Sequence, residues 1–343
     1  MTSRRALSCL LPARESFAAL AGHAQLAEAL GYASANCSHI AARDSFTVLA
    51  GLAMRTERIS LGTAVAPIYH RSPASMAQTA ATLDDLSAGR FRLGLGVGHR
   101  VTMGGWHGQE IGHPVDEMRE YLALVRAILA GDPPPEGRRW RSTFAFNGFT
   151  PRADLPIHLA GLSPAMLRLA GELADGVILW SCPHEYVRTV VVPEVTRGRR
   201  QAGKDLAGFT IMAAVPTGVG DDLGPLVEGV RSELHRYFSL PFYRAMFDAA
   251  GFGEDLAAYD AAAPDVEAQK QAISEEFIEA LCALGGERDV RAGIDRYRAA
   301  GATDPLLSAV SGSDVAATLR AAAAGGLDTS REASGATAGS GHP

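Results

Sequence analysis

The segment RISLGTAVAPIYHRSPASMAQTAATLDDLSAGRFRLGLG, residues 58–96, contains a complete strand–helix–strand unit. Residues 58–65 and 91–96 are short apolar runs, typical of parallel strands that are buried on both faces. Between them a helix is predicted from Pro73, which suits a first helical turn, to Leu86. The unit therefore predicts two parallel strands joined by a helical crossover.

The same alternation of short apolar runs and longer amphipathic segments continues along most of the chain. Six further strands are expected at residues 6–11, 33–37, 156–160, 176–180, 209–216 and 305–310. Helices are expected at residues 16–30, 44–54, 115–130, 163–173, 287–300 and 313–323. Eight strands alternating with helices predict an α/β protein with a (β/α)8 fold, the TIM barrel, whose ligand sites lie at its carboxyl-terminal mouth.

Two internal segments do not fit the repeating unit. Residues 221–282 are mostly helical by their spacing of apolar side chains and predict an insertion over the mouth of the barrel. Residues 136–151 predict a shorter excursion with a small hairpin. Residues 1–324 are interpreted as one catalytic domain, and residues 325–343, rich in Gly, Ala, Ser and Thr, as a disordered tail.

Composition limits the partners that we expect. The chain has 343 residues and a net charge of −6, and its basic cluster at 197–200 is interpreted as a solvated helix end, so neither nucleic acid nor a membrane is expected as a partner. No export signal is recognisable. Cys9, Cys37, Cys182 and Cys282 form no C-x-x-C pair, so no metal site or redox dithiol is expected. These features predict a cytoplasmic protein with reduced thiols and a small-molecule substrate.

Several blocks, taken in order, resemble the luciferase-like monooxygenase superfamily, and in particular its coenzyme F420-dependent branch. The blocks are LAEALGYAS (26–34), RTERISLGTAVAP (55–67), HRSPASMAQTAATLDDLSAGRFRLGLGVGH (70–99), PIHLAGLSPAMLRLAGELADGVIL (156–179), PFYRAMFDAAGF (241–252) and ALGGERDVRAGIDRYRAAGAT (283–303). The resemblance extends over residues 5–320. It implies an oxidoreductase that holds a reduced deazaflavin or flavin at the mouth of the barrel.

The segment GLSP, residues 161–164, has the sequence of a helix start that can bind an anion. Ser163 can cap the helix, and the first turn leaves free backbone N–H groups. By local sequence alone, capping is the favoured role of Ser163. The resemblance reverses that preference, because it implies that Gly161, Leu162 and Ser163 hold the phosphate of the cofactor.

Ala64 and Val65, at the end of an expected strand, are assigned to cofactor binding. In related proteins this position carries a cis peptide between non-proline residues, in a bulge that supports the cofactor ring. The resemblance therefore implies a cis Ala64–Val65 bond, and an ordinary trans strand end before Pro67 is the alternative.

The glycine-rich segment GLGVGH, residues 94–99, is also assigned to the cofactor ring. It lacks the G-x-G-x-x-G spacing of a dinucleotide-binding fold, so a Rossmann interpretation is rejected. Gly96, Gly98 and His99 are instead expected to let the strand end approach the ring closely.

His39 follows the strand expected at residues 33–37 and is the candidate catalytic residue, because histidine can donate, accept or carry a proton near neutral pH. From its position alone, a structural role is the alternative. The resemblance implies that His39 faces the reactive ring or the substrate. Ser38 stands where related proteins often have an acidic residue. It is assigned to cofactor binding, and no proton relay through a carboxylate is expected there.

The remaining assignments concern the pocket around cofactor and substrate. Trp106, His107 and Trp180 are expected to line the substrate pocket, with loop packing as the alternative for the first two, and Ser181 is expected to bind the cofactor. Val101 stands where sugar-phosphate dehydrogenases of this branch have a proton-donating glutamate, so a sugar phosphate is not expected as substrate. The aromatic residues of the insertion form either apolar walls of the pocket or helix-packing core: Tyr237, Phe238, Phe242, Tyr243 and Phe247.

Three functions are consistent with these residues. The first is hydride transfer between reduced F420 and an organic C=C, C=N or C=O bond. The second is oxygenation by reduced FMN and O2 through a peroxyflavin, which requires a dry pocket. The third is a non-catalytic flavin-binding paralogue. The resemblance also implies a homodimer.

Overall fold

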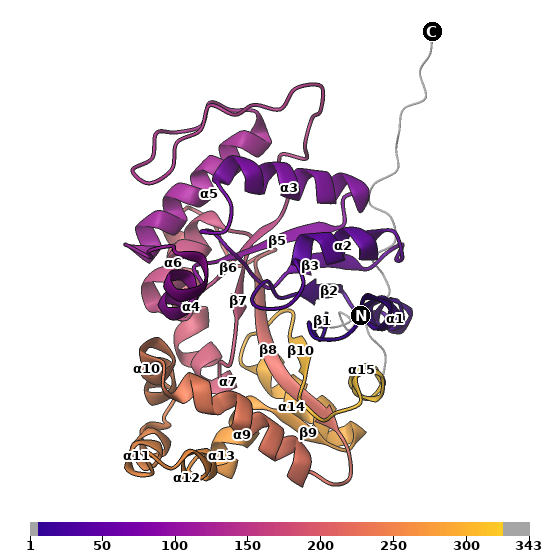
Figure 1. The fold of residues 1–343 in the computed structure, drawn as a ribbon, viewed down its shortest axis with the longest axis vertical. Helices are drawn as coiled ribbons and strands as arrows, with labels where there is room; N and C mark the ends of the chain where they lie inside the picture. Colours follow the sequence, from indigo (N-terminus) through magenta and orange to yellow (C-terminus); the bar gives the residue numbers. More distant parts are fainter. Residues whose placement is uncertain (1–5, 325–343) are drawn as a thin grey trace.

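The computed structural model describes residues 6–324, and eight parallel strands in it close into a barrel (Figure 1). The barrel strands are β1 Ser8–Leu10, β2 Ser34–Cys37, β3 Ser60–Thr63, β5 Phe91–Gly96, β6 Ile157–Ala160, β7 Gly176–Leu179, β8 Thr210–Val219 and β10 Leu306–Ala309. Strand β10 pairs with both β1 and β8, so that the first and last strands of the chain seal the barrel. The predicted (β/α)8 fold is confirmed.

Helices connect the strands and cover the outside of the barrel (Figure 1). They are α1 Phe17–Leu30, α2 Ser45–Ala53, α3 Pro73–Leu86, α5 Pro114–Ala130, α6 Pro164–Leu173, α8 Val192–Gln201, α14 Glu287–Ala299 and α15 Val315–Ala323. Asp44 and Ser163 accept hydrogen bonds from first-turn amides, and Gly31 ends α1 with a φ of 85°. These caps, which the sequence indicated, fix where the helices begin and end.

A hydrogen-bonded polar network fills the inside of the barrel near the amino-terminal ends of its strands. The Ser8 hydroxyl donates to the carboxylate oxygens of Asp304 at 2.8 and 2.9 Å. Ser34 donates to Ser8 Oγ at 2.7 Å, and Asn36 Nδ2 donates to Ser34 Oγ at 2.8 Å. Arg92 lies 3.5 Å from Asp304. These five side chains, called the N-terminal network below, close this end of the barrel with hydrogen bonds.

The range predicted as a mostly helical insertion contains five helices between β8 and β10. They are α9 Gly224–Phe238, α10 Pro241–Ala249, α11 Gly253–Ala261, α12 Val266–Gln271 and α13 Glu275–Leu281. Figure 1 shows them gathered at one side of the barrel. A short strand that was not predicted, β9 Ala283–Gly285, pairs with Thr217–Val219 of β8 and brings the chain back.

Further local features differ from the predictions. No strand forms within residues 136–151, so the predicted hairpin is wrong; the Glu120 carboxylate accepts the amides of residues 138–140 and holds a loop instead. Helix α4, Arg100–His107, was not predicted. The long third strand is divided, because β3 ends before the Ala64–Val65 bond and the two-residue β4, Ala66–Pro67, pairs with β5. A short helix α7, His184–Tyr186, and a π-helical turn, Val187–Val191, lead into α8.

Other sequence-based expectations concern membranes, thiols and the tail. Within residues 6–324, no helix has both the length and the apolar composition to cross a membrane. All four cysteines are buried and free, and burial raises the pKa of Cys37 to about 12. The described part of the chain has no cluster of three His, Cys, Asp or Glu side chains that could bind a metal. The tail predicted for residues 325–343 lies outside the described residues.

Candidate functional site

The candidate site lies at the carboxyl-terminal mouth of the barrel. The predicted site residues follow successive strands: Ser38 and His39 after β2, Ala64 and Val65 between β3 and β4, Gly96, Gly98 and His99 at the end of β5, Gly161, Leu162 and Ser163 after β6, and Trp180 and Ser181 after β7. The backbone N–H of Ala64 donates to the Cys37 carbonyl at 2.9 Å. The Ala64–Val65 segment therefore lies beside the chain that leads into His39.

His39 is held by the first turn of α2. Its Nδ1 lies 2.9 Å from Ser45 Oγ, and the Ser45 backbone N–H donates to the same nitrogen at 3.3 Å. With Nδ1 engaged, Nε2 is the nitrogen left for exchange with a ligand. Burial lowers the pKa of His39 below 6.5, although the Asp44 carboxylate, 3.7 Å from Nδ1, opposes this shift. The ring is therefore mainly neutral at neutral pH.

Two further histidines lie next to His39, and for one of them, His70, the sequence suggested no role. The ring centroids of His39 and His70 are 5.3 Å apart, and those of His70 and His107 are 4.0 Å apart. Nε2 of His70 is buried and has no hydrogen-bond partner within residues 6–324. Burial, together with His107, His39 and Arg71, lowers the pKa of His70 to about 4. Local sequence gives no signal for this cluster because its members lie far apart along the chain.

Glycines bring the end of β5 close to the Ala64–Val65 bond, which is cis, as the resemblance predicted. A Cβ atom at Gly96 would lie 2.6 Å from Val65 Cγ2. Gly98 has a φ of 68°, which favours glycine, and it turns the chain into His99. Glycine at these two positions therefore permits close packing against Val65 and the turn into His99.

The start of α6 is capped by one side chain and still has a first-turn N–H group available to a ligand. Ser163 Oγ accepts the N–H of Met166 at 3.3 Å, which is the capping role that the local sequence favoured. The N–H of Ala165 has no acceptor inside the helix, because first-turn amides precede every intrahelical carbonyl partner. The Tyr186 hydroxyl, which was not foreseen, donates to the Leu162 carbonyl at 2.8 Å and fixes the loop. This helix start can accept an anion while Ser163 keeps its capping bond.

Side-chain hydrogen bonds connect the end of β7 to the insertion. Trp180 Nε1 donates to Tyr237 Oη at 2.7 Å, and Arg236 Nη2 donates to the same oxygen at 3.1 Å. Ser181 is buried and has a φ of 48°. Trp180, predicted as a pocket residue, therefore also fixes α9 beside the mouth, a bond that sequence reasoning missed.

The aromatic residues of the insertion divide into two groups. Phe238 and Phe247 are fully buried, with ring centroids 5.0 Å apart, and form the core of the insertion. Phe242 is 46% exposed and stacks on His99, with centroids 5.4 Å apart and planes inclined by 12°. Tyr243 lies 6.0 Å from the same histidine. Helix packing therefore accounts for the first two, whereas Phe242 and Tyr243 contact a predicted site residue.

Helix α4 forms part of the rim of the mouth. It begins directly after His99, and its last turn brings His107 against His70. Val101 and Trp106 on the same helix are large apolar side chains that remain exposed. Trp106 is thus accessible to a substrate that enters beside this helix.

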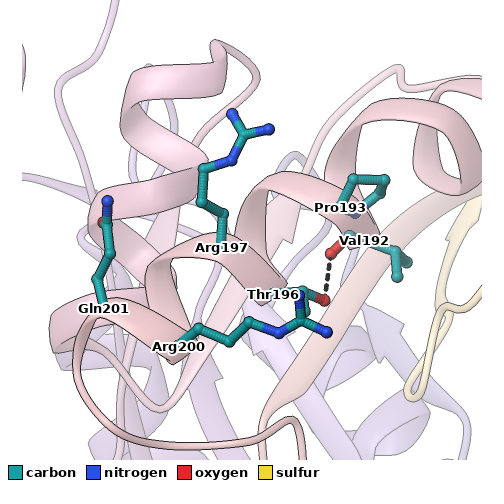
Figure 2. Close-up of a pocket in the computed structure, with 6 residues that line it drawn as sticks. All are labelled: Val192, Pro193, Thr196, Arg197, Arg200 and Gln201. Atoms are coloured by element: carbon teal, nitrogen blue, oxygen red, sulfur yellow. Dashed lines mark hydrogen bonds between the residues drawn. The ribbon is translucent and has the colours of Figure 1, made fainter.

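A surface hollow elsewhere on the barrel does not coincide with the predicted site. Figure 2 shows that it lies on the outer helix α8 and is lined by Val192, Pro193, Thr196, Arg197, Arg200 and Gln201. Arg197 forms an ion pair with Glu194 at 2.9 Å, and the Thr196 hydroxyl donates to the Val192 carbonyl at 2.7 Å. These residues form the solvent-facing helix end that the sequence indicated.

The mouth combines a mainly neutral histidine, a glycine-containing strand end and an open helix start, so the chain is a (β/α)8-barrel protein with a candidate ligand site at the carboxyl ends of its strands. The sequence model of the luciferase-like monooxygenase family matches residues 3–304. The chain belongs to this family, which confirms the resemblance seen in the sequence.

Individual relatives agree with this assignment. A Mycobacterium tuberculosis protein named as a coenzyme F420-dependent oxidoreductase is 28% identical over 288 residues, which cover 76% of this chain and 82% of the relative. The coenzyme F420-dependent tetrahydromethanopterin reductase of Methanopyrus kandleri has a TM-score of 0.80 at 22% identity, covering 94% of this chain and 98% of that chain. The FMN-bound oxygenating constituent of 3,6-diketocamphane monooxygenase from Pseudomonas putida has a TM-score of 0.69 at 18% identity, with the same coverage. The two structures show a shared fold.

Proposed function

We propose that the chain is an F420-dependent oxidoreductase that transfers hydride between F420H2 and an organic substrate with a C=C, C=N or C=O bond. Membership of the family and the F420-dependent relative support this cofactor. The observation that carries the proposal is a partly buried, mainly neutral His39 at the same mouth as the glycine end of β5 and the open start of α6. Such a mouth can hold a flat ring and its phosphate and move a proton beside them.

The residues at the mouth fit a redox ring with a phosphorylated side arm. A Cβ at Gly96 would lie 2.6 Å from Val65 Cγ2, so glycine at this position lets the end of β5 pack closely against the Ala64–Val65 segment that we assign to the ring pocket. Nδ1 of His99 is buried and lacks a hydrogen-bond partner within residues 6–324. Buried polar atoms of this kind are typical of sites that a ligand completes.

Each predicted site residue takes one role in this proposal. The phosphate is held by the loop and first turn of Gly161, Leu162 and Ser163. The ring pocket is formed by Ser38, Ala64, Val65, Gly96, Gly98, His99 and Ser181. The substrate pocket is lined by Trp106, His107 and Trp180. His39 faces the reactive ring or the substrate and moves the proton.

Bound F420H2 supplies the hydride, and the protein supplies orientation and a proton. When hydride reaches one atom of the substrate double bond, negative charge develops on the other atom, and Nε2 of His39 protonates it. In the opposite direction the neutral ring of His39 accepts that proton. Trp180, which donates to Tyr237, joins the insertion to the barrel and excludes water from the reacting atoms.

The proposal is tested by titrating purified apoprotein with F420 and with FMN, each oxidised and reduced, and following fluorescence. We expect tighter binding of F420 and turnover of an activated alkene such as cyclohexenone, an imine or a ketone. Tighter binding of FMN with consumption of O2 would support the monooxygenase instead. Tight binding without turnover by any reductant would support the non-catalytic paralogue, and either result overturns the proposal.

We also infer that the protein acts in the cytoplasm as a homodimer, with residues 1–324 as one catalytic domain. Buried free thiols suit a reducing compartment. Val101, exposed on α4, supports the exclusion of sugar phosphates as substrates, because it cannot donate a proton. Size-exclusion chromatography with light scattering checks the dimer, and a monomer at micromolar concentration would contradict it.

A further inference from the structure

Three histidines form a row that runs from the mouth of the barrel to its surface. This histidine row consists of His39, His70 and His107, with successive ring centroids 5.3 and 4.0 Å apart. The side chain of His39 is 13% exposed, whereas His107, in the last turn of α4, is exposed. The row therefore begins at the proposed reacting atoms and ends in bulk solvent.

The middle member, His70, has a polar atom that the protein does not satisfy. Its Nε2 is buried and has no hydrogen-bond partner within residues 6–324. Burying an imidazole nitrogen in this way is unfavourable, and an apolar ring of similar size would pack there without that penalty. The nitrogen therefore points to a role for His70 in addition to packing.

The charged groups around the row come from α2 and from the loop after β4. The Asp44 carboxylate lies 3.7 Å from His39 Nδ1 and is paired with Arg71 at 2.8 Å. Arg71 also lies 4.5 Å above the ring of Phe46. Arg71 and His107 both oppose protonation of His39 and His70, and burial acts in the same direction. Both rings are thus mainly neutral at neutral pH, and a neutral imidazole can accept a proton on one nitrogen while releasing one from the other.

We propose that His70 and His107 form a proton path between His39 and bulk solvent. This inference rests on the proposed function and deepens it by giving the site its proton source. A mainly neutral His39 needs a proton delivered to it before it can protonate a substrate.

The proton balance of the path is complete in both directions. In reduction, the substrate forms a C–H bond with the hydride and takes a proton from His39 Nε2. His70 then reprotonates His39, and His107 reprotonates His70 from solvent. Because His70 Nε2 bonds to neither neighbouring ring within residues 6–324, water carries the proton from one ring to the next. Bound F420H2 supplies the hydride, and the proton released on its oxidation returns to solvent, so no net proton is consumed. In oxidation the same transfers run in reverse.

The first test is imidazole NMR of the apoprotein, which needs neither cofactor nor substrate. His107→Phe removes an imidazole that opposes protonation of His70 and His39, so the pKa values of both rise in this variant. His23→Gln is the matched control, because His23 pairs with Glu15 beside α1, outside the row, and its loss leaves both values unchanged. If the pKa of His70 is the same in His107→Phe as in the wild type, the row is not coupled and the proposal falls.

The second test measures proton delivery in the F420-loaded protein with cyclohexenone as acceptor. His70→Phe keeps a ring of similar size that cannot carry a proton, so kcat falls about tenfold or more while KM and F420 affinity stay near wild type. In His107→Ala, which leaves space for a free imidazole, added imidazole restores most of the rate because this position is exposed. His70→Asn serves as a second variant if the Phe protein does not fold.

The outcomes separate the path from the proposed function. A folded His70 variant with wild-type kcat and an unchanged solvent deuterium isotope effect would overturn the path even where F420 binds. If the wild type binds no F420, the proposed function fails on its own. The path is then judged in the apoprotein by exchange of the His39 imidazole protons with water. We expect this exchange to slow about tenfold in His70→Phe, and equal exchange overturns the path.

Discussion

The polar side chains at the two ends of the barrel differ in whether they hydrogen-bond to one another. In the N-terminal network, the side chains of Ser8, Ser34 and Asp304 are joined by hydrogen bonds of 2.7 to 2.9 Å. At the opposite end, Nε2 of His70 and Nδ1 of His99 are buried without hydrogen-bond partners within residues 6–324.

This difference shows where the fold gains stability and where it keeps groups available for chemistry. A buried network whose members bond one another stabilises one arrangement of the strands. A buried nitrogen without a partner lowers stability until a ligand or a proton binds. Substitutions at the amino-terminal end should therefore change unfolding, and substitutions at the mouth should change binding and turnover.

We expect the largest effect from Asp304→Ala. This change removes the acceptor of the Ser8 hydroxyl and leaves Arg92 without its nearby carboxylate, so the free energy of unfolding should fall by about 3 kcal/mol. Urea unfolding measures this loss. The Asp304→Asn variant keeps an acceptor and should lose less. Wild-type stability in Asp304→Ala, or a loss of F420 affinity in its folded fraction, would contradict the proposed division between the two ends.

His39→Ala tests the proposed proton transfer at the mouth of the barrel. Loss of the proton-carrying ring should lower kcat about hundredfold, which corresponds to about 2.7 kcal/mol in the barrier, with little change in unfolding. Stopped-flow reduction of cyclohexenone and thermal unfolding measure the two quantities. Ser45→Ala, which removes one partner of Nδ1, should have a smaller effect on kcat. An unchanged rate in His39→Ala would return this residue to a structural role.

Gly161→Val tests the phosphate loop. A Cβ at this position would lie 2.7 Å from Met166 Cγ, so a larger side chain displaces the start of α6. We expect F420 affinity to fall about tenfold, or about 1.4 kcal/mol, with the barrel still folded. Fluorescence titration measures it. Gly22→Ala is the control, because no atom lies within 4 Å of its added Cβ. Equal affinity in Gly161→Val would remove the phosphate assignment.

Ser163→Ala should have the smallest effect, because it removes a single cap. The bond from the Met166 N–H is lost, and stability should fall by about 1 kcal/mol. Ser163→Asp separates capping from phosphate binding: aspartate restores the cap, but its charge repels a phosphate. We therefore expect Ser163→Asp to recover thermal stability and to bind F420 more weakly than Ser163→Ala. Equal binding by the two variants would place the phosphate elsewhere.

Local sequence signals predicted those parts of the fold that local chemistry controls. Strand β5 was predicted with its observed bounds, because FRLGLG is a mainly apolar run between turn residues, interrupted only by Arg92. Helix α3 was predicted correctly because Pro73 starts it after the Ser72 cap. The cis Ala64–Val65 bond came from the family resemblance, since the residues themselves allowed a trans strand end as well.

The features that were missed depend on distant contacts or on short segments. Gly104 and Gly105 lower the helix propensity of α4, which hid it. The loop at 136–151 is held by Glu120 from α5, a contact that no local pattern predicts. Local sequence could not predict a role for His70 either, because that role depends on the distances between its ring and those of His39 and His107.

The insertion between strands β8 and β9 bears on how the substrate range of this protein can evolve. The insertion leaves β8 at Val219 and returns through β9, which pairs with the same stretch of β8. The Gly220 N–H donates to the Gly285 carbonyl at 3.1 Å, so the two ends of the segment meet. A segment whose ends meet can be lengthened, shortened or exchanged with little strain on the barrel. Because Trp180 and His99 contact this segment, exchanging it alone offers a route to new substrates with the same redox machinery.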